Sequence, residues 1–449
     1  MLLSSSSYFI FLVGVFLLYW PLARMRVAAL GVILLANYFF YAKWDLVYLL
    51  LIPAASSLDF LIGLGLQASQ SPRVRRLLVA ASVVLNVGLL AVLRYVPVAP
   101  VALPLTLSFY VFQALTYTID LYRGDAPGTR SYLAHLAAVS FFPTTLAGPI
   151  TRVSSLISQF EKRKALDSAD GSRALFLIGV GLMKKLLIAD YLSSNLVNRV
   201  FDFPTLYTGA ETLIAVYAYA LQIYYDFSGY SDIAMGSALL LGIRLPANFN
   251  QPYAAENLAD FWRRWHISLS NWLRDYLYFS LPGKRVKVLS YANLAITMIL
   301  GGLWHGASWN FVIWGALHGA GLVCVRLWQT HSGSSRAQGA GRYVNMVVTF
   351  HFVAFAWIFF RAPDFDAAMA ILGRIASLTA SFANISGPLA LVLAIGILAH
   401  YTPKKWFDWS LAFYVRAPFY AQAAALALLT LGLQNVVATG AAPFIYTKF

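Results

Sequence analysis

A histidine in an apolar, glycine-flanked segment is the residue of this sequence best suited to chemistry. His305 follows the apolar run 288–303 and precedes Gly306, with Gly301 and Gly302 about one helical turn earlier. A neutral imidazole can take a proton from a hydroxyl and activate it as a nucleophile, and glycines permit a bend and the close approach of a ligand. The alternative is an interior histidine that only hydrogen-bonds to a neighbouring helix. The residues around His305 leave both interpretations open.

A second group of chemically capable side chains lies in residues 260–279. Treated as one helix, this segment has one apolar and aromatic stripe beside two polar stripes. The apolar stripe contains Trp262, Trp265, Leu269, Trp272, Leu273 and Tyr276, and the polar stripes contain Arg263, His266, Ser270 and Arg274, and Arg264, Ser268, Asn271 and Asp275. The segment is too polar to cross a bilayer. It is therefore either an amphipathic helix at the membrane interface or a helix whose polar face brings arginine and histidine to a substrate.

Carboxylates and lysines also interrupt apolar segments elsewhere in the chain. Asp226 and Asp232 lie in a stretch that is dense in hydroxyl groups, which suits either a transport site or a structural polar cluster. Lys184, Lys185 and Asp190 interrupt another apolar segment. Because an isolated charge is costly at membrane depth, we expect an internal ion pair among these three residues.

The composition identifies the setting in which these groups work. Of the 449 residues, 60% are hydrophobic and 11% are charged, whereas soluble domains are about 25% charged. This excludes an ordinary cytosolic protein, a disordered chain and a secreted disulfide scaffold, and it indicates an integral membrane protein. The net charge of +15 is explained by basic cytoplasmic loops, so we expect no nucleic-acid binding. One cysteine and no zinc-like spacing predict no metal site.

The apolar segments that must position the histidines predict an all-α polytopic protein with roughly 11–13 membrane helices. We treat residues 1–449 as a single integral membrane domain. The candidate spans are residues 5–23, 27–42, 46–66, 77–97, 104–122, 174–196, 207–226, 288–303, 307–328, 344–361, 386–400 and 418–437.

Residues 131–150 do not fit a simple alternation of crossings. The segment is apolar, but prolines at 143 and 149 interrupt it, and the basic run 162–164 follows. A crossing here would place that run outside, against the positive-inside rule. We therefore predict a re-entrant segment, which is stable at membrane depth only where protein buries it or where it lines a cavity.

Six separated motifs in this chain resemble those of the membrane-bound O-acyltransferases, most closely the bacterial alginate O-acetyltransferase branch. The motifs with the most distinctive residues are Phe261-Trp262-Arg263-Arg264-Trp265-His266 and Gly301-Gly302-Leu303-Trp304-His305-Gly306. The others are Leu103–Tyr110 with Ile119–Gly124, Ala147-Gly148-Pro149, Tyr225–Asp232 and Trp357–Ala362.

The resemblance implies a helical fold with re-entrant segments around a central cavity. It implies that His305 is the catalytic histidine and that His266 is a second functional histidine. We further expect the following residues to line the acyl-donor path or the cavity: Arg263, Trp265, Asn271, Trp304 and Asp226.

The resemblance also implies a reaction and its setting. We expect an O-acyltransferase of the bacterial inner membrane, with acetyl-CoA as a cytoplasmic acyl-donor substrate and no bound cofactor. The final acceptor would be an extracellular or periplasmic polysaccharide, reached through a periplasmic acetyltransferase partner. Burial disfavours the charged imidazolium, which would keep His305 available as a general base.

Three alternatives remain. The first is a transferase of the same family with another substrate, such as a D-alanyl transferase or an acetylase of peptidoglycan or cellulose. The second is a transporter that uses Asp226 and Asp232. The third is a non-catalytic scaffold for an export machine.

Overall fold

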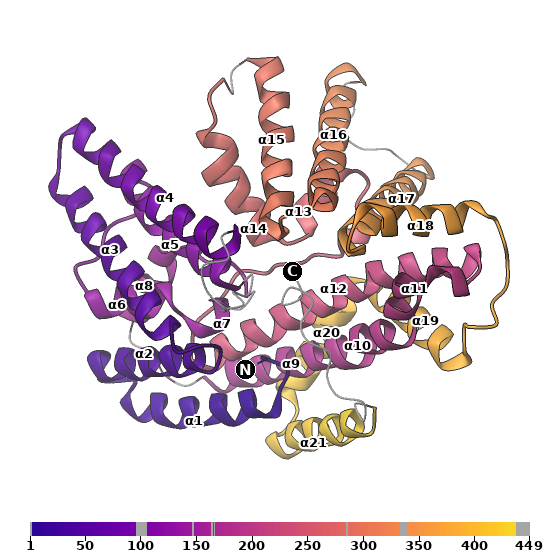
Figure 1. Cartoon of the computed structure of the whole chain (residues 1–449). Coiled ribbons are helices and arrows are strands. Elements are labelled where there is room, and N and C mark those ends of the chain that lie inside the picture. The colour runs from indigo at the N-terminus through magenta and orange to yellow at the C-terminus, as the bar shows by residue number, and fades with distance from the viewer. Residues whose placement is uncertain are drawn as a thin grey trace.

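The computed structural model consists of helices joined by short connections, and it describes residues 2–95, 106–145, 148–162, 165, 167–283, 286–332 and 339–436. No strand occurs in these ranges. In Figure 1 the first helices form one side of the molecule, and the α15 and α16 helices stand together on another. The short helices α13 and α14 lie between these groups, near the middle of the view.

The N-terminal part is a bundle of apolar helices. The long members are α1 (Ser6–Leu22), α2 (Arg26–Ala42), α3 (Tyr48–Ala68), α4 (Pro72–Tyr95) and α5 (Thr106–Arg123). Three short helices, α6 (Tyr132–Val139), α7 (Phe142–Thr145) and α8 (Val153–Glu161), follow them. The residues of α6 and α7 are mostly buried, so the predicted interruption of residues 131–150 is confirmed. Re-entry into a membrane stays a prediction.

Two long helical segments cross the middle of the molecule side by side. The first runs through α9 (Ser168–Leu182), η1 (Met183–Ala189), α10 (Asp190–Leu192), η2 (Ser193–Val197) and α11 (Asn198–Asp202). The η1 and η2 parts are π-helical, a rare geometry that is frequent at functional sites. After η3 (Pro204–Leu206), the second segment is α12 (Gly209–Leu240), which begins with a capping box between Thr208 and Glu211.

Residues 260–279 are not one helix, which corrects the sequence-based expectation. After η4 (Pro252–Ala254), α13 (Leu258–Arg264) ends before Trp265, and α14 (Ile267–Trp272) begins after His266. The π-helical η5 (Leu273–Leu277) and then η6 (Tyr278–Ser280) continue it. His266 has a φ of 41°, a left-handed conformation that is uncommon for residues other than glycine. The single-helix stripes are therefore wrong across this bend.

The pair α15 (Lys287–His305) and α16 (Trp309–Ser332) carries His305 at its turn. Their backbones approach closely at two glycines. A Cβ atom on Gly315 would lie 2.5 Å from the carbonyl oxygen of Met298, and one on Gly302 would clash with the carbonyl oxygen of Phe311. This close contact fixes the end of α15 against α16 and thereby fixes the position of His305.

Substitution of Gly302 by valine is expected to lower the free energy of unfolding by about 1–3 kcal/mol. The new side chain meets helix backbone, which cannot move aside as a flexible side chain would. Thermal unfolding of the purified protein in detergent measures the effect. Gly14→Val is a matched control, since nothing lies within 4 Å of a Cβ at that glycine. Equal melting temperatures for both variants would contradict the proposed backbone contact.

The remaining helices lie beyond the α15–α16 pair in the sequence. They are α17 (Gly341–Arg361), α18 (Phe365–Ala376), α19 (Gly387–Tyr401), α20 (Lys404–Arg416) and α21 (Phe419–Val436). One face of α17 is buried and includes Trp357 and Phe360, both of which are used at the site described below.

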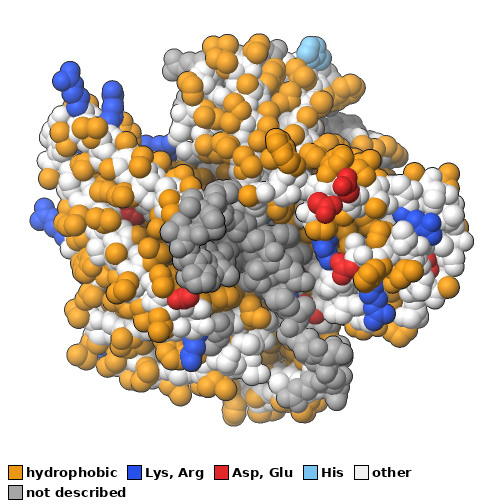
Figure 2. Space-filling view, in the orientation of Figure 1, with side chains coloured by type: hydrophobic (Ala, Val, Ile, Leu, Met, Phe, Trp, Pro, Cys, Tyr) orange, Lys and Arg blue, Asp and Glu red, His pale blue; other side chains and the backbone are white. Residues whose placement is uncertain are grey.

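The helices suit a membrane. Five of those described are long and apolar enough to cross one, namely residues 48–68, 72–92, 288–305, 309–331 and 341–361, and four shorter apolar helices accompany them. Leu50 and Ile10 are 78% and 75% exposed, and Figure 2 shows hydrophobic side chains over much of the visible face. Each predicted span coincides with a helix where it is described, while residues 96–97, 104–105 and 437 lie outside the described residues. The total of 11–13 crossings stays a prediction.

Candidate active site

His305 is buried among aromatic rings at the end of α15. The residue is 3% exposed to solvent. The imidazole lies 4.5 Å from the ring of Trp304, 4.8 Å from Phe360 and 5.3 Å from Trp314, measured between ring centroids. These neighbours come from α15, α17 and α16. Side chains from three helices therefore hold the histidine at the closely packed turn between α15 and α16.

His266 is buried at the bend between α13 and α14. The residue is 1% exposed, and its ring meets Phe227 of α12 edge-on at 4.6 Å. Its Nδ1 atom lies 3.3 Å from Oδ1 of Asn248. The bend lies outside the five candidate spans, and burial there lowers the pKa of His266 to about 3. The imidazole is consequently neutral at ordinary pH.

The two histidines line the same small cavity. The cavity has a volume of about 10 Å³, the space of roughly one water molecule. Its lining is formed by Trp262, Trp265, His266, Leu269, Leu273, Met298, Gly301, His305, Trp314 and Trp357. No aspartate, glutamate, lysine or arginine occurs among these described lining residues. The site therefore offers two imidazoles in an apolar, aromatic enclosure.

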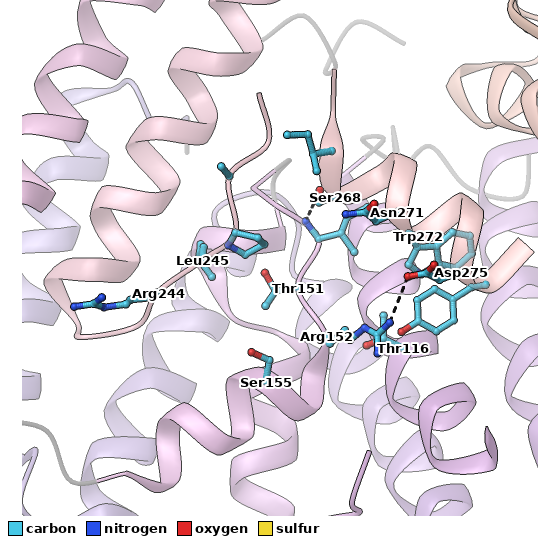
Figure 3. Close-up of a pocket in the computed structure, with 15 residues that line it drawn as sticks. Thr116, Thr151, Arg152, Ser155, Arg244, Leu245, Ser268, Asn271, Trp272 and Asp275 are labelled. Atoms are coloured by element: carbon cyan, nitrogen blue, oxygen red, sulfur yellow. Dashed lines mark hydrogen bonds and ion pairs between the residues drawn. The ribbon is translucent and has the colours of Figure 1, made fainter. Parts of the chain in front are cut away.

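A larger cavity of about 460 Å³, lined by several polar side chains, lies beside α14. Figure 3 shows Arg244 at one side of it, with Arg152, Trp272 and Asp275 at the other. Arg152 pairs with Asp275 at 3.4 Å, whereas Arg244, which pairs with Asp170 at 2.7 Å, keeps a side chain 69% exposed. The volume falls within the range of pockets for small molecules and cofactors.

The short helix α14 is the wall between the two cavities. Ile267, Ser268 and Asn271 line the larger cavity, while Leu269 lines the smaller one. Aromatic rings also connect the two sides. Trp272, which lines the larger cavity, stacks on Phe112 at 4.2 Å, and Phe112 lies 5.5 Å from Trp304 beside His305.

The structure brings together only some of the predicted site residues. Trp265 lines the histidine cavity, Trp304 contacts His305, and Asn271 lines the larger cavity. Arg263 lines neither of these two cavities; its side chain is 64% exposed and pairs with Asp260. Asp226 also lies outside both linings. Within the described part of the chain, no group of His, Cys, Asp or Glu is arranged to hold a metal ion.

The carboxylates considered for transport are held in ion pairs. Lys185, which is 1% exposed, lies 2.5 Å from Asp226 and 2.8 Å from Asp190, and Lys184 lies 2.6 Å from Asp232. The predicted pairing of Lys185 with Asp190 is confirmed. The cluster joins η1 and α10 to α12. This arrangement favours a structural role for these charges over a transport site.

Replacement of Lys185 by methionine is expected to lower the free energy of unfolding by about 3–5 kcal/mol, because the change removes a buried cation from Asp190 and from the buried carboxylate of Asp226. Thermal unfolding in detergent measures the loss. Lys184→Met is the matched control, because the Lys184 side chain is 23% exposed, whereas that of Lys185 is 1% exposed, and water at Lys184 screens its one ion pair. A smaller loss for Lys185→Met than for Lys184→Met would contradict this account.

Residues of the connection between α12 and η4 escaped the sequence analysis. Asn248 is buried at 1% exposure and contacts His266, while Arg244 borders the larger cavity. The run Pro246-Ala247-Asn248-Phe249-Asn250 contains two asparagines, and neither has a distinguishing spacing. Only the pairing of Asn248 with a segment eighteen residues away indicates a role.

The fold and the site together define a class of protein. It is a multi-pass helical membrane protein that holds two buried histidines in one cavity, next to a larger polar cavity. The chain belongs to the membrane-bound O-acyltransferase family, whose family model matches residues 40–362. That range contains every residue of both cavities. The chain is an O-acyltransferase.

Relatives with assigned activities match most of the chain. It is 37% identical to a probable alginate O-acetylase of Azotobacter vinelandii, over 93% of this chain and 86% of the relative. A probable alginate O-acetylase of Pseudomonas aeruginosa is 36% identical, over 90% and 82%. A peptidoglycan O-acetyltransferase of Helicobacter pylori is 34% identical, over 76% and 72%.

Proposed function

We propose that this protein transfers an acetyl group from acetyl-CoA, on the cytoplasmic side of the bacterial inner membrane, toward the hydroxyl groups of a polysaccharide outside the cytoplasm. The observation that carries the proposal is the meeting of His305 and His266 in one buried cavity beside a larger polar one. The similarity to alginate O-acetylases over most of the chain supports the acetyl group and the polysaccharide.

The larger cavity is the proposed binding site of the acyl donor. CoA carries several phosphate charges, and guanidinium groups suit phosphate recognition. Arg244 presents an exposed side chain there, and Arg152 lies across the cavity. The volume of about 460 Å³ accommodates a part of CoA, and the aromatic contacts from Trp272 lead toward His305.

In the proposed reaction His305 is the general base. It takes the proton of the acceptor hydroxyl while the hydroxyl oxygen attacks the thioester carbonyl carbon. The carbon–sulfur bond then breaks, CoA leaves as the thiolate, and a proton returns to the sulfur. Such base catalysis accelerates reactions about 10²–10⁴-fold. The aromatic enclosure of His305 excludes water, which would otherwise hydrolyse the thioester.

The proposed acceptor is an alginate-like exopolysaccharide, with a periplasmic acetyltransferase as the partner that completes the esterification. Peptidoglycan is a second candidate, because a peptidoglycan O-acetyltransferase is 34% identical over 76% of this chain. Both acceptors present sugar hydroxyl groups and require the same chemistry at His305.

Proton NMR of cell-surface polymers distinguishes these acceptors. Exopolysaccharide and peptidoglycan are isolated separately from cells with and without the gene, and O-acetyl ester signals are integrated in each. Loss of ester from the exopolysaccharide alone supports the proposal, and loss from peptidoglycan alone supports the second candidate. Unchanged ester in both polymers would refute both. Labelled acetyl-CoA supplied to inside-out membrane vesicles tests the donor, since transfer requires a donor site on the exposed cytoplasmic face.

A further inference from the structure

The connection after α12 pairs with the bend that carries His266. The backbone N–H of Ile267 donates to the carbonyl oxygen of Asn248 at 2.9 Å, and the backbone N–H of Asn250 donates to the carbonyl oxygen of Arg264 at 2.9 Å. The buried Asn248 side chain thus lies directly against the left-handed turn at His266. Strained backbone of this kind persists where the surrounding structure holds it, and it is concentrated at functional sites.

The hydrogen bonds of Asn248 identify its oxygen without ambiguity. One terminal atom of the side chain accepts a hydrogen bond from the backbone N–H of Ser268 at 3.2 Å, and a backbone N–H can only donate. This atom is therefore the oxygen, Oδ1. The Ser268 hydroxyl donates to the same atom at 2.7 Å, because an amide oxygen can only accept, and the hydroxyl oxygen itself accepts the N–H of Ile150. The nitrogen, Nδ2, donates to Ser231 of α12 at 3.2 Å.

This assignment determines the tautomer of His266. Its Nδ1 atom faces Oδ1 of Asn248 at 3.3 Å, and an oxygen of this kind can only accept. Nδ1 must therefore carry the hydrogen, and in a neutral imidazole Nε2 then carries the lone pair. Nε2 is buried and has no hydrogen-bond partner among the described residues. The ring itself lines the cavity shared with His305.

We propose that Asn248 is a positioning residue that holds His266 as the Nδ1–H tautomer, so that Nε2 accepts a hydrogen bond from an O–H or N–H group of a bound substrate. The inference rests on the proposed function and adds to it the direction of one hydrogen bond between His266 and the substrate. A neutral His266 of this form cannot donate to the acyl carbonyl or to the oxyanion that develops there. The partner is an alcohol of the acceptor or an amide N–H in the pantetheine arm of the donor, which share the same donor chemistry.

Solid-state NMR of the full chain in liposomes tests the tautomer without any substrate. The protein is labelled with [13C,15N]histidine, and the signals of His266 are isolated by subtracting the spectrum of His266→Gln. We expect the unprotonated nitrogen to be Nε2 in the wild type and in Asn248→Asp, which retains an accepting oxygen. In Asn248→Leu we expect a mixture of tautomers. A wild-type His266 protonated at Nε2, or an unchanged tautomer in Asn248→Leu, would overturn the proposal.

Activity measurements separate positioning from simple structural loss. Asn248→Leu is expected to lower kcat at least about 10²-fold, whereas Asn248→Asp is expected to retain activity within about tenfold. The matched control is Asn37→Leu, because Asn37 is also fully buried and hydrogen-bonded, but to α6 and Phe142. An equal loss of kcat in Asn37→Leu and Asn248→Leu would show that Asn248 acts only through stability.

Binding of acetyl-CoA to the detergent-solubilised protein identifies the source of the hydrogen. If the pantetheine amide is the partner, Asn248→Leu and His266→Phe weaken the Kd for acetyl-CoA about tenfold or more. If the acceptor hydroxyl is the partner, the Kd is unchanged and only the rate of transfer falls. Tight acetyl-CoA binding together with full transfer in His266→Phe would refute the role of Nε2. That result would leave intact the acetyl transfer itself and the base catalysis proposed for His305.

Discussion

Substitution of His305 by alanine is expected to lower acetyl transfer about 10²–10⁴-fold, the usual contribution of a general base. The imidazole is held by rings from three helices, so water that enters the vacated space does not reproduce its position or basicity. The O-acetyl ester content of surface polysaccharide, measured by proton NMR in complemented deletion cells, reports the loss. Western blotting of the membrane fraction verifies that the variant is inserted.

A second buried histidine provides the control for this experiment. His400 of α19 is also 3% exposed, and it accepts a hydrogen bond from the backbone of Tyr253. It does not line the histidine cavity. His400→Ala therefore removes an imidazole of similar burial without touching the proposed reaction. Normal ester content in His305→Ala would refute the catalytic assignment, and equal losses in both variants would assign the effect to stability.

Substitution of Gly301 by alanine is expected to lower acetyl transfer about 10²-fold without a loss of stability. Gly301 lines a cavity of about 10 Å³, so one added methyl group occupies the space that the acyl group needs. A Cβ atom there would lie 3.5 Å from Cδ1 of Leu273, which is an ordinary contact, so the fold accepts the change. The measurements are the rate of transfer from acetyl-CoA and the melting temperature of the purified protein.

The same cavity limits the length of the acyl chain. A difference of one methylene in an apolar pocket changes kcat/KM about 10–200-fold, so we expect acetyl-CoA to be preferred strongly over butyryl-CoA. Met298→Ala enlarges the cavity and is expected to reduce this preference at least about tenfold. The ratio of kcat/KM for the two donors is independent of the folded fraction, which matters because truncating a buried methionine costs about 2–5 kcal/mol. An unchanged ratio would place the acyl group elsewhere.

The positions of the long helices could be predicted from the sequence because hydropathy and helix length are local properties. The predicted spans 27–42 and 344–361 differ from α2 and α17 by only a few residues at their ends. The broken segment 131–150 was also predictable, since its prolines report directly on backbone geometry. The residues at which each helix enters and leaves the membrane were less predictable, because composition indicates the presence of a membrane only indirectly.

The bend at His266 could not be predicted in the same way. Apolar spacing over residues 260–279 fits one helix, and no glycine or proline interrupts it. The helix breaks because the backbone near Arg264 and Ile267 pairs with Asn250 and Asn248 instead. That pairing joins distant parts of the chain, and it outweighs local helix propensity.

The candidate site was predictable only in part, and the family motifs supplied that part. Spacing alone left His305 open between a base and an interior residue, while the motifs pointed to both His305 and His266. The cavity that joins them is a property of packing between α14, α15, α16 and α17. The predicted lining role of Arg263 has no counterpart in the two cavities, because its guanidinium is exposed and pairs with Asp260 of the same helix.

The buried lysine of η1 constrains how the chain enters the bilayer during synthesis. A single lysine at the centre of a membrane helix costs about 2.5–3.5 kcal/mol, and Lys185 finds one of its two carboxylates on α12, forty-one residues later. Asp190 lies in the same earlier segment, but its single charge cannot balance both Lys184 and Lys185, so the segment is neutralised only once Asp226 and Asp232 of α12 have left the ribosome. We expect the translocon to retain the segment until that moment and to release the two helices into lipid as a pair.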